Sequence, residues 1–173
     1  FIEKAFEQEG VNFTVYRTDE EFERFPLGSD FIPQDVCIFK IHGCLSKPES
    51  IVATVEKQAV GLSGQPLLVL KWLQSQHPFI FWGYSGWDLK IHLDYLGTVS
   101  VAASSPGFIW SLHREAGYEE KPSPYILELA RLYGEKAIIG HTLAPQAIAS
   151  TLISSKVSLP KSVAYTPDEY SMW

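Results

Sequence analysis

The chain has 173 residues, of which 46% are hydrophobic and 20% are charged, and its formal net charge is −6. This length and composition are typical of one globular domain with a sizeable core. The acidic balance, without a lysine or arginine cluster, argues against nucleic acid or an anionic membrane as the main partner, and no apolar run reaches the ~20 residues that span a bilayer.

Strand and helix patterns alternate along the first part of the chain. Residues 1–10 read as the middle of a helix without an N-cap or a signal-peptide pattern, so we expect the chain to be a piece cut on its N-terminal side. Period-two alternation predicts a strand over 11–17, and a charged loop or short helix follows at 18–26. A nearly apolar strand is expected at 36–41, and a short extended segment at 50–54.

The second part of the chain continues this alternation. Helices are predicted at 66–76, 88–96, 124–133 and 145–153, and strands at 79–82, 108–112 and 137–139. The helix at 124–133 has the most complete signals, with Ser123 as N-cap, Pro124 at its first position and Gly134 after its last turn. Its predicted buried face consists of Ile126, Leu129, Ala130 and Tyr133.

Apolar strands separated by helices predict an α/β fold, in which helices cover both faces of a mainly parallel sheet. The carboxyl ends of such strands lie at one edge, where ligands bind. Glycine, histidine or hydroxyl residues follow four of the predicted strands, at 42–43, 83–86, 113–114 and 140–142. We therefore expect a ligand cleft at this edge. The domain is predicted to cover residues 1–155, with 156–173 as a tail or linker.

The stretch Gly-Tyr-Ser-Gly, residues 83–86, joins a predicted strand to a predicted helix. Ser85 and Asp88 fit a capping box, which explains a helix start without any ligand. The box does not account for Gly83 and Gly86, which allow close approach of a backbone or a ligand. Exposed amides at a helix start favour phosphate, so structural and phosphate-binding or ribose-binding interpretations both stay open.

His42 ends a buried strand and precedes a glycine, where it can titrate near neutrality and meet a ligand hydroxyl. A lone histidine is more often structural, so both interpretations stay open. Cys37 reads as a small buried hydrophobe. Nothing in the sequence indicates a lowered pKa for Cys44, which is expected to be structural or incidental. Two cysteines do not make a disulfide scaffold or a zinc site, and a reducing, cytoplasmic setting is expected.

The segments FKIHG, SIVAT and FIFWGYSGWD, in this order, resemble the sirtuin-like NAD-consuming domains common in bacterial defence proteins. The segment FIEKAF…VYRTDEEF is similar to the one that directly follows a Thr-x-Asn-x-Asp motif in that family. The resemblance covers residues 1 to about 152. It implies a Rossmann-like three-layer domain that is N-terminally truncated here and takes NAD as its substrate.

The resemblance also implies roles for single positions. His42 matches the catalytic histidine, a general base on a ribose hydroxyl, and Gly43 matches a glycine that passes close to the ribose. The other matched positions are Gly83, Tyr84 and Ser85 for the phosphates and ribose, Asp88 as an acid of the defence-type branch, Ser111 and His113 for the adenosine ribose, and Thr142 for adenine.

The chain departs from deacetylating sirtuins between His42 and Gly83. That interval lacks their four zinc-binding cysteines, so no zinc is expected and a peptide deacylase is disfavoured. The catalytic asparagine of the family would precede Phe1. The resemblance therefore implies an NAD glycohydrolase that releases nicotinamide as a defence effector in a longer protein. Homo-oligomers could form through parts outside this chain, and this chain alone is expected to be nearly inactive.

Two other functions remain open. The domain could bind NAD or an ADP-ribose derivative as a sensor without cleaving it. It could also be a serine hydrolase, because the context of Ser85 resembles a nucleophile elbow. The G-x-S-x-G pattern requires a glycine where the chain has Trp87, which disfavours the hydrolase.

Overall fold

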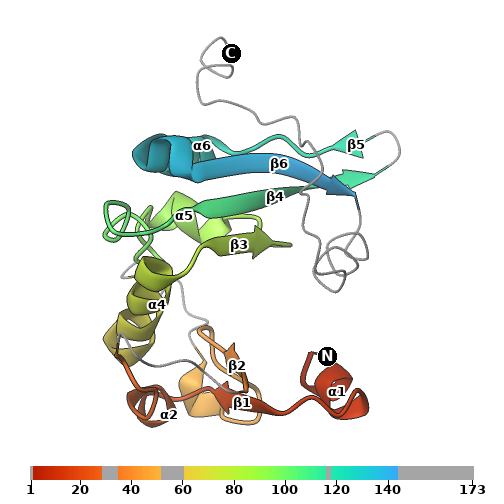
Figure 1. The fold of residues 1–173 in the computed structure, drawn as a ribbon, viewed down its shortest axis with the longest axis vertical. Coiled ribbons are helices and arrows are strands. Elements are labelled where there is room, and N and C mark those ends of the chain that lie inside the picture. The colour runs from red at the N-terminus through yellow and green to blue at the C-terminus, as the bar shows by residue number, and fades with distance from the viewer. Residues whose placement is uncertain (1, 29–34, 52–60, 116–117, 144–173) are drawn as a thin grey trace.

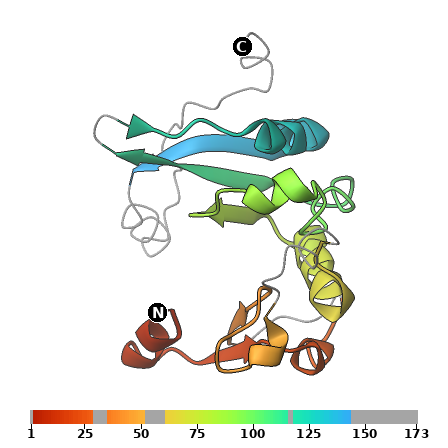
Figure 2. The same ribbon diagram turned by 180° about the vertical axis from the view of Figure 1, so that it is seen from behind.

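A computed structural model describes residues 2–28, 35–51, 61–115 and 118–143 (Figure 1). Two lobes are joined by a long helix, α4, as the views from the front and from behind both show (Figures 1 and 2). The N-terminal lobe holds α1 (Ile2–Gln8), β1 (Phe13–Tyr16), α2 (Asp19–Glu23), β2 (Val36–Phe39) and the 3-10 helix η1 (Pro48–Ser50). After α4 (Gly64–Gln76), the C-terminal lobe holds β3 (Phe79–Trp82), α5 (Trp87–Ile91), β4 (Phe108–Glu115), β5 (Tyr118–Glu119), α6 (Pro124–Tyr133), the 3-10 helix η2 (Gly134–Lys136) and β6 (Ala137–Leu143).

The strands are mainly parallel, as predicted, but in the described residues they form two sheets and not one. In the N-terminal lobe β1 pairs with β2 in parallel. In the C-terminal lobe β4 lies between β3 and β6, parallel to both, and β5 pairs antiparallel with the end of β4. The carboxyl ends of β3, β4 and β6 therefore point to one edge of the C-terminal sheet.

The C-terminal lobe has the larger core. One face of its sheet presents Phe81, Trp110 and Ile139, which pack in one cluster with the buried face of α6. The helix has the predicted caps: Ser123 Oγ accepts a hydrogen bond from the Ile126 amide at 3.3 Å, and Gly134 follows with φ 56°. The predicted face is confirmed, since all four of its members are buried: Ile126, Leu129, Ala130 and Tyr133.

The other face of that sheet is largely uncovered by described residues. Ile80, Trp82 and Ile138 point away from the α6 side and are 48%, 45% and 38% exposed. A three-layer domain would cover these side chains with a second layer of helices. The described residues thus supply two layers of the predicted three in this lobe.

The N-terminal lobe has a small aromatic core. Phe22 and Phe25 of the α2 region pack with Val69 of α4, and Tyr16 stacks on Phe39 with ring centroids 5.0 Å apart. Ile41 packs against this cluster and also against the C-terminal core. The segment that carries His42 therefore lies where the two cores meet.

Several predicted boundaries were wrong. The helix predicted at 88–96 ends at Ile91, because Asp94 accepts hydrogen bonds from the amides of Val99 at 2.7 Å and Ser100 at 3.1 Å and so stabilises a run of turns. Strands β4 and β6 extend to Glu115 and Leu143, since they pair with each other well past the predicted ends.

The extended segment predicted at 50–54 was wrong at its start, because Ser50 lies in the 3-10 helix η1. Residues 52–54, the helix predicted at 145–153 and the domain boundary predicted at 155 lie outside the described residues. No helix in the described part of the chain is long and apolar enough to cross a membrane.

Candidate functional site

His42 lies in a turn directly after β2, and the turn is closed by a hydrogen bond from the Gly43 amide to the Lys40 carbonyl at 3.0 Å. Gly43 has φ 84°, and a Cβ there would collide with the backbone of Ser50 and Ile51. This close approach explains the glycine without a ligand. The packed backbone fixes the position of the neighbouring histidine.

The exposed His42 imidazole rests against the fully buried Tyr95. Their rings are nearly parallel, at 14°, with centroids 5.8 Å apart. The Tyr95 hydroxyl lies 3.4 Å from His42 Nδ1, which is a long hydrogen bond. Tyr95 thus contacts one side of the imidazole of an exposed histidine.

The turn after β3 differs from the predicted capping box. Gly86, not Ser85, is the N-cap of α5, and its φ is 71°. A side chain at position 86 would press on the Trp110 ring, since a Cβ would lie 3.1 Å from its nearest atom. Ser85 Oγ instead accepts a hydrogen bond from the Trp87 amide at 3.3 Å. With five residues, α5 is too short for its dipole to bind phosphate strongly.

Asp88 also has a different partner from the one that the box predicts. Its Oδ2 accepts a hydrogen bond from the Tyr84 hydroxyl at 3.0 Å. Burial raises the pKa of Tyr84, and the neighbouring Asp88 carboxylate raises it further. The same two causes, in the same order, raise the pKa of Tyr95. Both phenols therefore stay protonated at neutral pH.

Two hydrogen-bonded pairs make up what we call the polar row: His42 with Tyr95, and Tyr84 with Asp88. The Asp88 carboxylate is close enough to Tyr95 to raise its pKa, so the two pairs lie near each other. Parts of two sequence motifs singled out above, His-Gly and Gly-Tyr-Ser, thereby lie near each other. Tyr95 was missed by sequence reasoning, which placed it inside a helix. No spacing pattern relates it to His42, 53 residues away.

The other predicted residues lie along β4 and β6. Ser111 is buried in the middle of β4, opposite Trp82 and Gly140, so it does not end a strand as predicted. His113 lies two residues further, beyond the end of β3, and its amide donates to a Glu120 carboxylate oxygen at 2.8 Å. The Thr142 backbone pairs beside His113. The edge of the sheet is therefore stepped, with β4 and β6 extending past β3.

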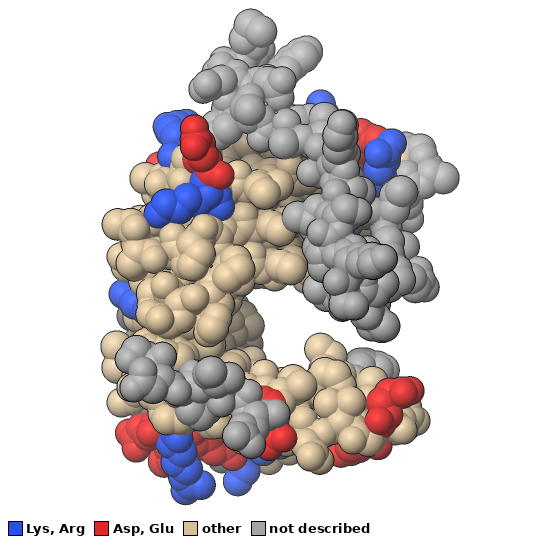
Figure 3. Space-filling model, in the orientation of Figure 1, with Lys and Arg blue, Asp and Glu red and all other residues tan. Residues whose placement is uncertain are grey.

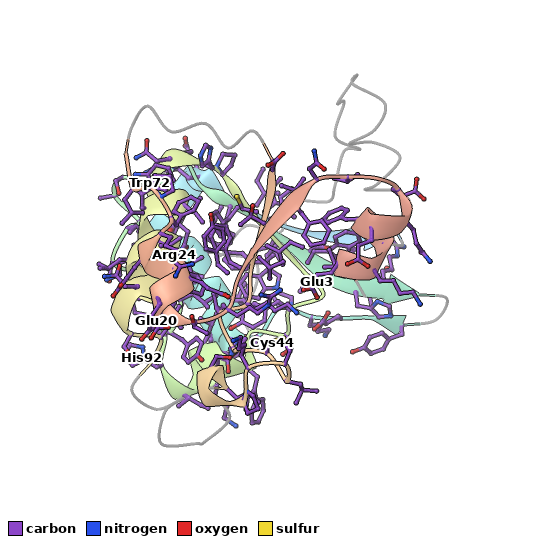
Figure 4. The ribbon with its side chains drawn as sticks, turned by 90° about the horizontal axis from the view of Figure 1, so that it is seen from below. Glu3, Glu20, Arg24, Cys44, Trp72 and His92 are labelled. Atoms are coloured by element: carbon purple, nitrogen blue, oxygen red, sulfur yellow. The ribbon has the colours of Figure 1, made fainter. Side chains whose placement is uncertain are left out.

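The thiol of Cys44 has a lowered pKa, which the sequence did not indicate. Hydrogen bonds from Ser46, with a further one from Lys40, lower the pKa of its thiol to about 7. Sγ lies 3.2 Å from Ser46 Oγ and 3.3 Å from Lys40 Nζ, which also pairs with Glu3 of α1 at 2.8 Å (Glu3 and Cys44 are labelled in Figure 4). Lys40, four residues before Cys44, is the signal in the sequence that could have predicted this lowered pKa. Burial, by contrast, raises the pKa of Cys37.

Figure 3 shows a hollow on one side of the molecule, between the lobe that carries α1 and the lobe of β3 to β6. Its visible described walls carry few charged side chains, and most charges lie on the outer surfaces of the two lobes. Within the described ranges, no group of three or more His, Cys, Asp or Glu side chains is arranged to hold a metal ion.

Comparison with protein families matches residues 1–128 to the SIR2-like domain. No curated protein and no solved structure matches the chain. The match includes the polar row and ends within α6, so the resemblance over 129–152 stays a prediction. SIR2-like domains include NAD-consuming enzymes. Since the match covers well over half of the sequence, the chain belongs to the SIR2-like domain family.

Proposed function

We propose that this domain binds NAD and hydrolyses its nicotinamide–ribose bond, with His42 as the general base. The observation that carries the proposal is the contact between the exposed His42 and Tyr95, since Tyr95 belongs to the core cluster against which Tyr84 of the turn after β3 also packs. The proposal therefore places a substrate held by that turn against the imidazole.

The chemistry needs few groups. When the glycosidic bond breaks, its electron pair leaves with nicotinamide, which becomes neutral, and the ribose becomes an oxocarbenium-like cation. Water adds to the anomeric carbon and loses a proton, which gives ADP-ribose. His42 would take a proton from a ribose hydroxyl and so stabilise the developing cation. The expected asparagine upstream of Phe1 would orient the water.

The remaining residues would bind the dinucleotide. The main chain at Gly83, Tyr84 and Ser85 would hold the phosphates and a ribose, because positive φ at Gly83 (65°) turns the backbone sharply at the end of β3. The amides of this turn, and not the dipole of the five-residue α5, would provide the donors. His113 and Thr142 would contact the adenosine part along the stepped edge, whereas Ser111, buried in the middle of β4, is not assigned a contact with the ligand.

The proposal extends to the setting of the protein. The family resemblance favours a cytoplasmic defence effector whose NADase activity is switched on by a signal and which assembles through segments outside this chain. No zinc is required, because water and a base suffice for the hydrolysis. Depletion of NAD in cells that express the active protein, and not in cells that express His42→Ala, would support this setting.

The direct test is His42→Ala in the protein with its natural flanking sequence. Nicotinamide release, followed by chromatography, should fall at least about a hundredfold, because general base catalysis contributes that much or more. His77→Ala is the matched control, since His77 is an exposed histidine at the end of α4. Unchanged hydrolysis in His42→Ala would refute the catalytic assignment.

Three other results would replace the proposal with a rival. NAD binding by calorimetry without nicotinamide release would indicate a sensor. Nicotinamide release that depends on an acetylated peptide would indicate a deacylase. Labelling of Ser85 by a fluorophosphonate would indicate a serine hydrolase, although the observed hydrogen bond of Ser85 Oγ goes to the Trp87 amide and not to a histidine.

A further inference from the structure

The contact between His42 and Tyr95 bears on where the proton of the neutral imidazole lies. A neutral histidine acts as a base only through the nitrogen that carries no proton. Which nitrogen that is depends on the hydrogen bond that the other one makes. In His42, Nδ1 faces the Tyr95 hydroxyl at 3.4 Å, so Tyr95 decides the tautomer.

The direction of this hydrogen bond follows from which nitrogen the contact leaves open. Nδ1 faces the Tyr95 hydroxyl, so Nε2 is the nitrogen left for a substrate on the exposed side of His42. A neutral imidazole with its lone pair on Nε2 carries its proton on Nδ1. The Tyr95 oxygen then accepts the hydrogen bond from that Nδ1–H.

We propose that Tyr95 is a positioning residue, which holds the neutral His42 imidazole with its proton on Nδ1 and its lone pair on Nε2. The inference rests on the proposed function, in which Nε2 takes a proton from the ribose. The contact between Tyr95 and His42 resembles, in its logic, the orientation of a catalytic histidine by a buried acceptor.

The packing of Tyr95 fits this role. Its amide donates to the His92 carbonyl at 2.9 Å, and its carbonyl accepts from the Leu62 amide at 3.1 Å, so its backbone is held on both sides. Its ring is part of the large C-terminal core. The 3.4 Å distance is long, but catalytic hydrogen bonds often shorten when substrate binds. A fixed ring and a single hydroxyl direction are what a tautomer-setting residue requires.

The first test reads the tautomer itself and needs no NAD turnover. The full protein is labelled with ¹⁵N at its histidine side chains, and the His42 signals are identified by their loss in His42→Ala. For the neutral form of the imidazole, the ¹⁵N shifts should show the proton on Nδ1. In Tyr95→Phe this preference should be lost. A proton on Nε2 in the wild type, or no change in Tyr95→Phe, would overturn the proposal.

Tyr133→Phe is the matched control. Tyr133 is also buried in the C-terminal core, and its hydroxyl donates to the Thr98 carbonyl at 2.7 Å. Its loss should lower thermal stability without affecting the His42 shifts. A change of tautomer in both variants would mean that general loosening of the core, and not the Tyr95 hydroxyl, is responsible, and would also count against the proposal.

The second test measures catalysis. In Tyr95→Phe, kcat for nicotinamide release should fall about ten- to a hundredfold with little change in KM, because the base is wrongly protonated while the binding groups stay in place. Tyr133→Phe should keep the parental kcat. If the wild type does not cleave NAD at all, the proposed function fails, but the tautomer result still confirms or refutes the role of Tyr95.

Discussion

The two lobes are stabilised in different ways. In the C-terminal lobe, twelve residues form one buried cluster, and α6 has side-chain and glycine caps. In the N-terminal lobe, the corresponding cluster has three buried residues, Phe22, Phe25 and Val69, one of them from α4. Partly exposed ion pairs supplement it, where Glu3 of α1 meets Arg17 at 3.7 Å and Lys40 at 2.8 Å.

This difference concerns the candidate site directly. Tyr95, Asp88 and Tyr84 belong to the better-packed C-terminal lobe, whereas His42 is carried by the less densely packed N-terminal one. The turn after β3 and His42 are thus supported by cores of unequal size. We expect the position of His42, more than that of the turn, to respond to changes in stability.

The largest expected effect comes from removing an aromatic side chain from each core. Trp110→Ala, at a position 1% exposed, should lower the free energy of unfolding of the whole chain by about 3–5 kcal/mol. Phe25→Ala, at a position 3% exposed, should mainly remove the protection of β1 and β2. Amide hydrogen exchange distinguishes the two outcomes. Equal loss of protection in β4 and β6 in both variants would show that the lobes unfold as one unit.

An intermediate effect is expected at Gly43. Alanine there must adopt φ 84° and would also collide with the Ser50 carbonyl, so Gly43→Ala should cost more than the ~1–2 kcal/mol of left-handed backbone alone. Gly10 is the matched control, with φ 65° and no atom within 4 Å of an added Cβ. Thermal unfolding of both variants measures the difference. Similar losses would mean that the contact with Ser50 is not rigid.

The smallest expected effect is on the pH dependence of the stability of α1, which the ion pairs of Glu3 provide. The hydrogen bond from Lys40, with the charges of Lys40 and Arg17, lowers the pKa of Glu3 below 4.5 in the folded state. The unfolded chain therefore binds the proton more readily, and the stabilisation present above pH 4.5 is lost as the pH falls through the lowered pKa. Glu3→Gln should reduce this acid sensitivity of α1, measured by hydrogen exchange at pH 3 to 6. Because the Glu3 side chain is partly exposed, the change should be small, and salt should reduce it further.

Sequence reasoning was most successful where local signals agree with packing. The helix α6 was predicted with both caps and its buried face, because cap residues and a 3.6-residue period act within one element. The ends of β4 and β6 could not be predicted, since each strand extends for as long as the other pairs with it. The helix after β3 was predicted too long, because the Asp94 carboxylate accepts hydrogen bonds from later backbone amides and so favours turns at that point.

For the candidate site, the sequence showed the two motifs but not the contacts that their residues make in the structure. His42 and the turn after β3 were singled out from residue types and strand ends alone. Tyr95 acts through a contact between residues far apart in the sequence, and no periodicity encodes it. Asp88, by contrast, has its partner only four residues away, but this partner is Tyr84 and not the helix start that the local pattern favoured.

Ile41 gives this arrangement a mechanical consequence. Its side chain packs against both hydrophobic clusters, and a single peptide bond separates it from His42. Sliding of one lobe against the other would therefore displace the imidazole by a comparable amount. A ligand, or a neighbouring segment, that moves one lobe relative to the other would then change the position of His42 through hydrophobic contacts alone.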